Sequence, residues 1–573
     1  MRLTWRSFQF LTARQKIELS TYLIFKVGTA AFDILGLVLL STSMSLLAST
    51  SVDHSAMVKA VLDWCGNLGF GNTYAVFALL ATGFFLLKSI IAIWLNNRIA
   101  IFGARVEAEQ ASKLFANFSN TEIGAESAET QSSYQFAVGR SAHVLFAQVP
   151  VVLGTIVGEI ALALAIGIYL STLNVFLLCF SLLFLGLVGY LNFSIVSKGV
   201  VKNNQRAIDS GFITQQLVLD VLANSRQIRA QRKSGNFVRR FAASRMRQAV
   251  ATSKVVALGY VSRYITEIAL IVGVALFLAQ RAFFGASDIA APTLTVFLAA
   301  AFRVIASMIP IQTAFATLSI IDHEGKLAFS LLDGVNASQS ENTIPDEKQP
   351  RIAFENVSYR YSQLGEKMFR GLSLEIPFGS FVVVKGPSGA GKSTLVDLMV
   401  GLKHPSEGHI RVFDAKGGGE IDWRNIALGY VPQKPNLIEG TLLENIALSY
   451  DEASDSRSKA SRAMQKAQLS EWASLLEDGL DTKFSVNLNN LSGGQLQRLG
   501  IARALYDEPA ILVLDEGTNS LDAETELEIC GILQSFKATM TIIVISHNDV
   551  FDSMATLKIH VDKFANATIE GMP

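Results

Sequence analysis

The length, composition and charge of the chain indicate a membrane protein with more than one domain. Its 573 residues exceed what a single ordinary core holds, and only 17% are charged, against roughly 25% in soluble domains. The formal net charge is zero and there is no basic tail, which argues against nucleic acid as a partner. Cys65, Cys179 and Cys530 fall in different predicted segments, so we expect neither a disulfide nor a metal site from them.

Six apolar runs occur in the first 320 residues, each long enough to cross a bilayer, which takes about 20 residues. They lie near residues 20–48, 73–96, 144–170, 172–197, 256–280 and 291–320. This pattern predicts an all-α membrane domain of six spans over residues 20–334. Residues 1–19 mix Arg and Lys with Trp and Phe and lack a signal-peptide pattern, which favours an amphipathic helix on the cytoplasmic membrane face.

Positive charge predicts the orientation of the spans. Residues 198–255 carry twelve Lys and Arg against two Asp, whereas the loops near 49–72 and 281–291 have almost none. The long basic segments and both termini are therefore expected in the cytoplasm. The segments 97–143 and 198–255 lack proline, so we expect the membrane helices to continue into the cytoplasm and to turn near 120–131 and 211–221.

Ionisable residues inside apolar spans are costly and usually face the bundle interior or a cavity. Arg263 and Glu267 are four residues apart and can pair along one helix face, whereas Arg303 has no partner nearby in sequence. Two interpretations stay open for Arg263 and Arg303: they line a polar translocation path, or they pair helices within the bundle. The full set is Lys26, Asp33, Lys88, Glu159, Arg263, Glu267 and Arg303.

Beyond the membrane domain the composition changes. Residues 335–349 are polar and contain Pro345, which predicts an interdomain linker. From residue 350 to 573, short β-branched runs such as "SFVVVKG" and "MTIIVISH" alternate with helical patterns such as "KSTLVDLMVGL". This alternation is typical of an α/β nucleotide-binding domain.

The stretch "GPSGAGKST" fits the phosphate-loop pattern G-x-x-x-x-G-K-[ST] between a predicted strand and a predicted helix. Backbone N–H groups of such a loop and of the helix N-terminus cradle the β- and γ-phosphates of ATP. Lys392 adds a positive charge there, and the Ser393 hydroxyl is expected to ligate Mg²⁺. The predicted ATP-binding residues of this loop are Gly386, Ser388, Gly389, Ala390, Gly391, Lys392, Ser393 and Thr394.

Three further strand ends carry candidate catalytic or metal-binding residues. The strand "ILVLDEG" ends in Asp515, expected on the metal side, and Glu516, the candidate base for the attacking water. His547 follows another apolar strand and could hold Glu516, the water and the γ-phosphate in place. Gln433 could reach the metal or the water without adding charge. With Lys392, these residues form the predicted catalytic set, and Ser393, Gln433 and Asp515 the predicted metal ligands.

An aromatic residue some 25 positions before the phosphate loop could stack on adenine. Tyr361 and Tyr359 in "VSYRYSQ" are both candidates, and strand alternation does not separate them because they share a face.

In this order the motifs resemble those of ATP-binding cassette (ABC) transporters, with "LSGGQ" at Leu491–Gln495 as the signature and "NSLD" at Asn519–Asp522 as the D-loop. The family uses the second aromatic of the pair, which implies Tyr361. The resemblance also implies a dimer, in which the signature of one chain closes on the ATP bound by the phosphate loop of the other. It therefore adds to the predicted ATP-binding residues Ser492, Gly493, Gly494, Gln495 and Asp522.

Six spans ahead of one nucleotide domain are similar to the half-transporters of the exporter branch. The resemblance implies a multidomain fold, an all-α membrane domain with long intracellular helices followed by an α/β P-loop ATPase domain. It implies a second, identical chain as partner, ATP and Mg²⁺ as cofactors, and a multi-pass protein among the lipids of the cytoplasmic (inner) membrane, with its N-terminus and ATPase domain in the cytoplasm.

The expected function is ATP-driven export or flipping of a lipidic, glycolipid or amphipathic substrate. Stretches such as "AAFRVIASMIPIQTAF" also resemble lipid-linked oligosaccharide flippases of the PglK type. The alternatives are a peptide or drug exporter of the same architecture, and an ATP-gated channel or sensor without pumping. Val486 stands where exporters usually carry a glutamate before the signature, so domain coupling is expected to use other contacts.

Overall fold

The computed structural model divides the chain into two compact units, one reaching to Asn336 and one from Ala337 to Pro573. The structure describes residues 6–47, 73–119, 135–173, 175–284, 291–333, 349–360, 368–416, 418–484, 491–516, 523–537, 539–562 and 567–570. The first unit is helical, and the second combines helices and strands. The predicted fold class, an α-helical domain of apolar helices followed by an α/β ATPase domain, is thus confirmed.

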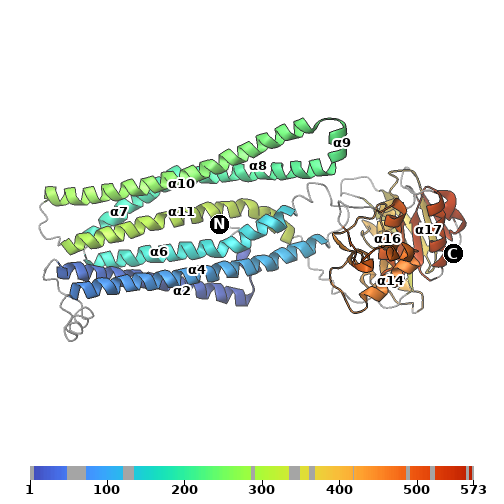
Figure 1. Cartoon of the computed structure of the whole chain (residues 1–573), viewed down its shortest axis with the longest axis horizontal. Coiled ribbons are helices and arrows are strands. Elements are labelled where there is room, and N and C mark those ends of the chain that lie inside the picture. Colours follow the sequence, from blue (N-terminus) through green and yellow to red (C-terminus); the bar gives the residue numbers. More distant parts are fainter. Residues whose placement is uncertain are drawn as a thin grey trace. The chain divides into compact units, whose positions relative to one another are not determined.

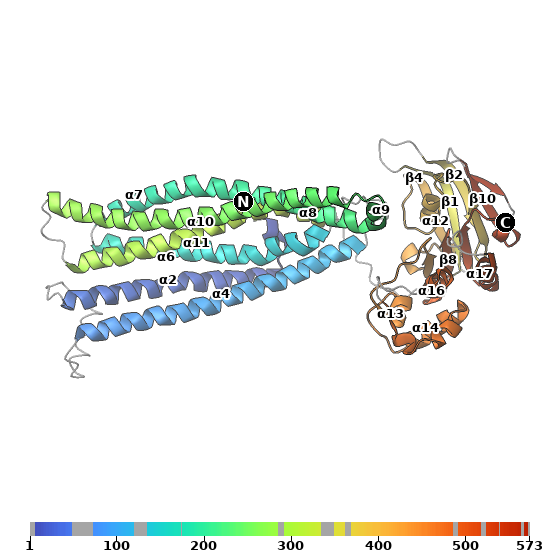
Figure 2. The ribbon, with the colours of Figure 1, turned by 45° about the horizontal axis from the view of Figure 1, so that its top comes forward.

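Long helices lie side by side in the first unit, as Figures 1 and 2 show. The main helices are α2 (Ala13–Leu47), α4 (Thr73–Ser119), α6 (Gln148–Leu173), α7 (Val175–Asn192), α8 (Lys198–Ala223), α9 (Ser225–Ala230), α10 (Ser234–Phe284) and α11 (Ala291–Asp333). Short 3-10 or π-helical turns are η1 (Phe8–Phe10), η2 (Ala137–Ser141), η3 (His143–Ala147) and η4 (Phe193–Ser197).

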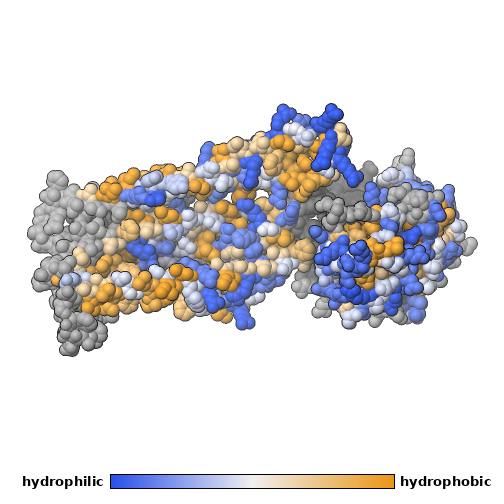
Figure 3. All heavy atoms as spheres, viewed as in Figure 1, coloured by the Kyte–Doolittle hydropathy of each residue, from blue (hydrophilic) through white to orange (hydrophobic). Residues whose placement is uncertain are grey.

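Among the described residues, five helical stretches are long and apolar enough to cross a membrane. They are Ala13–Met44, Tyr74–Ala116, Ala137–Ser171, Ser234–Gly273 and Phe302–Ile321, and each overlaps one predicted span. The remaining predicted span, 172–197, coincides with α7 and η4. Large apolar side chains such as Leu79 and Ile93 are about 70% exposed, and apolar atoms cover much of the visible face of this unit in Figure 3. The chain is therefore an integral membrane protein, since such a surface requires hydrocarbon around it.

The turn predicted near residues 211–221 is wrong. Helix α8 continues to Ala223, and the chain reverses through α9 and the residues before α10. Gly211 serves helix packing instead, because a Cβ there would lie 2.9 Å from the Gln248 side chain of α10. A buried hydrogen bond between the Thr214 and Ser244 hydroxyls (3.2 Å) joins the same two helices. The other predicted turn, at 120–131, lies outside the described residues.

The N-terminal segment differs from the separate amphipathic helix expected over residues 1–19. Helix α2 begins at Ala13, so residues 13–19 belong to the first membrane helix. Before it, the Phe10 ring lies 5.6 Å from that of Phe329 and 6.3 Å from that of Phe146. Leu11 is buried in the same cluster. The apolar side chains of this described stretch therefore pack into the helical unit.

The described residues of the second unit form three sheets. A six-stranded sheet has the order β11-β10-β3-β9-β8-β5, a three-stranded sheet the order β2-β1-β4, and β6 pairs with β7. The strands are β1 (Pro350–Tyr359), β2 (Phe369–Ile376), β3 (Phe381–Lys385), β4 (Glu407–Asp414), β5 (Leu428–Val431), β6 (Gly440–Thr441), β7 (Lys483–Phe484), β8 (Ile511–Asp515), β9 (Thr541–Ile545), β10 (Leu557–Val561) and β11 (Ala567–Glu570).

Helices cover both faces of the six-stranded sheet. They are α12 (Lys392–Met399), α13 (Leu442–Ala447), α14 (Ser456–Lys466), α15 (Ser470–Ser474), α16 (Gly493–Leu505) and α17 (Ala523–Ser535), with 3-10 turns η5 (Trp423–Asn425), η6 (Gly479–Asp481) and η7 (Asp549–Ser553). Val382 and Val384 of β3 pack in one core with α12, whereas Val383 packs in the other core with α16 and α17. Strands buried on both faces explain the continuous apolar runs in the sequence.

Several charged side chains within the predicted spans form ion pairs in the helical unit. Asp33 of α2, only 3% exposed, lies 2.9 Å from Lys88 Nζ of α4 and 3.3 Å from Arg303 Nε of α11. One carboxylate therefore holds two cations from two other helices. Arg263 Nε donates to Glu267 Oε1 at 2.8 Å, which confirms the predicted pair, and both side chains are at least half exposed. Arg303 thus has an ion-pair partner on another helix.

Replacing Asp33 should destabilise the helical unit. Asp33→Asn would leave Lys88 and Arg303 without their counter-charge in a poorly hydrated interior. We expect the free energy of unfolding to fall by about 2 kcal/mol, less than for a fully buried pair because Arg303 is one-third exposed. Thermal unfolding of the solubilised protein measures this loss. Glu267→Gln, in the exposed pair, is the control, and an equal effect of both variants would contradict the expectation.

Candidate nucleotide-binding site

Parallel strands bring the predicted catalytic residues to one edge of the six-stranded sheet. Strands β10, β3, β9, β8 and β5 are all parallel, so their carboxyl ends meet there. Strand β3 leads into the phosphate loop and Lys392, β8 ends in Asp515 before Glu516, β9 precedes His547 and β5 precedes Gln433. In open α/β sheets this edge is where ligands bind.

The phosphate loop depends on glycine conformations. Gly386, Gly389 and Gly391 have φ values of 150°, 80° and 96°, which other residues rarely adopt. A Cβ on Gly386 would also collide with the backbone oxygen of Val561. Helix α12 begins directly after the loop, with the exposed Ser393 and the buried Thr394 in its first turn. Unpaired N–H groups of a first helical turn favour an anion such as phosphate.

Lys392 lies at the centre of the site, with its side chain only 6% exposed. Its ammonium donates to the carbonyl oxygens of Gly386 (3.1 Å) and Pro387 (3.2 Å). The same atom lies 3.3 Å from His547 Nε2 and 3.6 Å from Glu516 Oε1. A positive charge in this sheltered position interacts strongly with anions because water screens it little.

Both carboxylate oxygens of Glu516 are held. Gln433 Nε2 donates to Oε2 at 3.0 Å, and His547 Nε2 lies 3.2 Å from Oε1. The backbone of Glu516 has a φ of 49°, in the left-handed region, and its N–H donates to the Ile545 oxygen of β9. Strain of this kind in a non-glycine residue is typical of functional sites. The structure therefore brings together the four residues of the predicted catalytic set.

Asp515 lies beside Glu516 in a half-buried position and has a partner that the sequence did not predict. The Tyr430 hydroxyl of β5 donates to Asp515 Oδ2 at 3.0 Å. Burial raises the pKa of Asp515, and the negative charge of Glu516 raises it further, while the Tyr430 hydrogen bond opposes the shift. The pairing requires β5 to lie next to β8, and nothing in the sequence signals that adjacency.

The sequence also did not predict an ion cluster at Lys385, directly before the phosphate loop. Lys385, the last residue of β3, lies 2.6 Å from a carboxylate oxygen of Asp549 and 2.6 Å from one of Asp552. Lys385 lowers the pKa of Asp549. Because Asp549 follows His547 by two residues, this cluster fastens the start of the loop to the segment that carries the histidine.

The signature forms the N-terminus of α16. The Ser492 hydroxyl accepts from the Gln495 N–H at 3.2 Å, and Gln495 Oε1 accepts from the Ser492 N–H at 2.9 Å. This reciprocal capping leaves Gly493 and Gly494 to begin the helix. Helices α16 and α12 pack on opposite faces of the sheet, so the structure does not place the signature with the phosphate loop of its own chain.

Some predictions concern residues that the structure does not describe. Tyr361, Asp522 and Val486 are outside the described residues, so the adenine contact, the D-loop acid and the altered segment before the signature stay predictions. The rival aromatic, Tyr359, ends β1 and packs, half-buried, against the core that also contains α12.

Comparisons with known proteins agree with this geometry. Residues 369–519 match the family model described as "ABC transporter". An ATP-dependent lipid A-core flippase of Cupriavidus pinatubonensis is 34% identical over 225 residues, 39% of this chain and 38% of the relative. The ABC multidrug transporter mdr2 of Aspergillus fumigatus is 40% identical over 203 residues, 34% of this chain and 25% of the relative. The chain thus matches well under half the length of these curated relatives.

A likeness over nearly the whole chain is found at the level of fold. The structure of a bacterial Atm1-family ABC exporter with ATP bound superimposes with a TM-score of 0.72, at 20% identity, over 97% of this chain and 95% of that one. Residues 369–519 are therefore an ABC transporter domain that binds nucleotide, and the chain has the fold of an ABC exporter.

Proposed function

We propose that the chain is one half of a dimeric transporter that uses ATP hydrolysis to export or flip a lipidic or amphipathic substrate. The observation that carries this proposal is the arrangement around Glu516. Its carboxylate is held by Gln433 and His547 beside Lys392, in a chain whose other unit consists of apolar membrane helices. The lipid A-core flippases among the relatives favour a lipid-like substrate, and the multidrug transporter leaves a drug or peptide as the alternative.

The residues at the sheet edge suit Mg²⁺ together with ATP. Ser393, Gln433 and Asp515 would offer a hydroxyl, an amide and a carboxylate oxygen, which are the donor types that Mg²⁺ prefers. Among the described residues no cluster of three or more His, Cys, Asp or Glu could hold a metal by itself. When bound, Mg²⁺ would neutralise charge that develops on the phosphates.

Each residue near Glu516 has a definite part in the proposed hydrolysis. Lys392 and the N–H groups of the loop bind and orient the phosphates. Glu516 accepts a hydrogen bond from the attacking water and orients it towards the γ-phosphate. Gln433 and His547 keep the two oxygens of Glu516 in place, since each lies within hydrogen-bonding distance of one of them.

The placement of the signature supports a dimer. Helix α16 packs on the face opposite α12, so Ser492, Gly493 and Gly494 are available to a second chain. The N-terminus of a helix carries positive partial charge, so this loop can hold a γ-phosphate although it has no lysine. Each chain has its own Lys392, Asp515, Glu516 and His547, so an identical chain suffices as the partner.

We place the protein in the cytoplasmic (inner) membrane, with the ATPase unit in the cytoplasm. The strongly basic segment 198–255 supports this orientation. Tyr361 and Asp522 complete the proposed ATP site as the adenine-stacking residue and the D-loop acid.

Glu516→Gln should abolish ATP turnover while ATP still binds. The amide keeps the shape of the side chain but no longer acts as a base, so we expect kcat to fall by about 100-fold or more. ATPase assays together with retention of ATP in the closed dimer measure the effect. Glu477→Gln, an exposed acid on another part of the unit, is the control. Undiminished turnover of the Glu516 variant would exclude the assigned role.

Reconstitution in proteoliposomes should reveal ATP-dependent movement of substrate. Among lipids, glycolipids and peptides, we expect a lipid or glycolipid to stimulate ATPase activity most, and its transfer between leaflets should stop in the Glu516→Gln variant. Stimulation by peptides alone would favour the peptide exporter. Passive equilibration that the variant does not affect would indicate a channel instead of a pump.

A further inference from the structure

Signature helix α16 is packed unusually closely against the segment that leads to and follows Gln433. A Cβ on Gly500 of α16 would lie 2.7 Å from Cγ of Pro435, and a Cβ on Gly429 of β5 would collide with the backbone oxygen of Ala504. Both glycines are therefore required for the helix to contact β5 and the segment after it. Contacts this close leave little room for the helix to slide independently.

Arg503, near the end of α16, fastens the same segment by hydrogen bonds. Its Nη1 donates to the Asn436 carbonyl at 3.0 Å and its Nε to the Asn445 carbonyl at 2.8 Å. Arg503 is half-buried, and this burial lowers the pKa of its guanidinium. A planar fork of donors fixes direction as well as distance, so the helix and the segment are held in one orientation.

Asn445 extends this connection into the segment itself. It is fully buried, and its amide nitrogen donates to the carbonyl oxygens of Ile438 and Thr441, both at 3.0 Å. Its amide oxygen accepts from the Ile438 N–H at 2.9 Å. Residues 436–445 are therefore tied to one another and, through Arg503, to α16.

The two ends of this connection are functional groups. At one end Gln433 donates to Glu516, the proposed base. At the other end α16 begins with Ser492, which the proposed dimer places at the ATP of the partner chain. A displacement of Gln433 at one ATP site would therefore move the signature that completes the other site.

We propose that Arg503 and Gly500 are positioning residues that lock the signature helix to the segment after Gln433 and so couple the two ATP sites of the dimer. This inference rests on the proposed function and deepens it. In such coupling, an event at one site changes the free energy of binding at the other, because both sites contact one element that moves as a whole. Weakening the lock should impair steps that need both sites and spare nucleotide binding by the chain's own phosphate loop.

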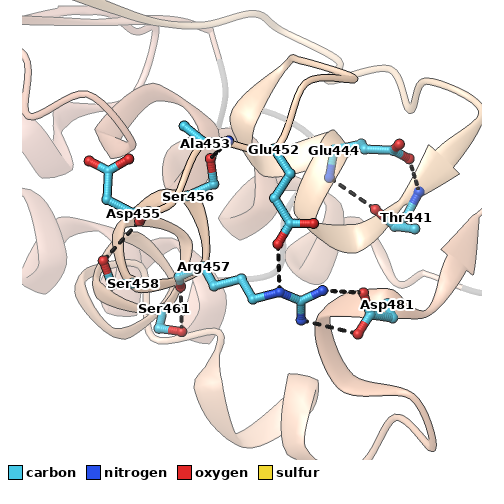
Figure 4. A network of polar contacts seen from close by, with 10 residues as sticks. All are labelled: Thr441, Glu444, Glu452, Ala453, Asp455, Ser456, Arg457, Ser458, Ser461 and Asp481. Atoms are coloured by element: carbon cyan, nitrogen blue, oxygen red, sulfur yellow. Dashed lines mark hydrogen bonds and ion pairs between the residues drawn. The ribbon is translucent and has the colours of Figure 1, made fainter.

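Arg457 provides a matched control within the same unit. Its Nε donates to Glu452 at 2.7 Å and its Nη2 to Asp481 at 2.7 Å, as Figure 4 shows. The side chain is about half exposed. Like Arg503, Arg457 donates to two different residues, but its acceptors are carboxylates and its hydrogen bonds do not involve α16 or residues 436–445.

The test compares Arg503→Lys, Gly500→Ala, their double variant and Arg457→Lys in the full-length protein. The measurements are ATPase kcat, the Hill coefficient for ATP, the Kd of a fluorescent ATP analogue and the melting temperature. We expect Arg503→Lys and Gly500→Ala to lower kcat roughly tenfold and to lower the Hill coefficient, with Kd within about twofold of the wild type. The melting temperature of Arg503→Lys should stay close to that of Arg457→Lys, so that its loss of kcat does not reflect unfolding.

The double variant tests whether both residues serve one lock. If they do, its kcat should be close to that of the worse single variant. Once one substitution has loosened the contact between α16 and residues 436–445, the other substitution has little left to remove. Single variants that behave like Arg457→Lys, a Kd that rises in step with the loss of kcat, or losses that multiply in the double variant would each overturn the inference. A wild-type protein without ATPase activity would instead overturn the proposed function.

Discussion

The common edge of five parallel strands is the constraint on which the candidate site depends. Because β3, β9, β8 and β5 end together, residues more than 150 positions apart in sequence, such as Lys392 and His547, lie within 3.3 Å of each other. Backbone hydrogen bonding between the strands, and not any attraction between these side chains, brings them together. This explains why Lys392, His547 and the carboxylate of Glu516 lie so close together.

Packing on the two faces of this sheet separates the phosphate loop from the signature. Successive residues of β3 point to opposite cores, one with α12 and the phosphate loop, the other with α16 and the signature. The phosphate loop and the signature of one chain therefore lie on different sides of the sheet, which is the physical basis for proposing a dimer. The close contacts of α16 with β5 and Pro435 then connect the halves within one chain.

Sequence-based predictions of position are confirmed where a residue follows an apolar strand or a local motif. Lys392, Asp515, Glu516, His547 and Gln433 were found because strand ends of an α/β sheet converge and because glycine loops bind phosphate. Predictions from sequence failed where a contact between residues far apart in sequence determines the structure. The turn after α8 was misplaced because its position depends on the packing of α8 against α10, where Gly211 permits contact with Gln248. Arg303 had no partner in its own segment, because Asp33 lies 270 residues earlier.

The sequence by itself determined the types of element, the apolar membrane helices, the α/β rhythm and the chemistry of the phosphate loop, because these depend on residue properties and spacings of a few positions. The tertiary structure alone decided that Tyr430 donates to Asp515, that Arg503 ties α16 to residues 436–445, and that Asp33 holds two cations. These contacts require knowing which strands and helices are neighbours. That information resides in the packing of whole elements, which no local pattern in the chain specifies.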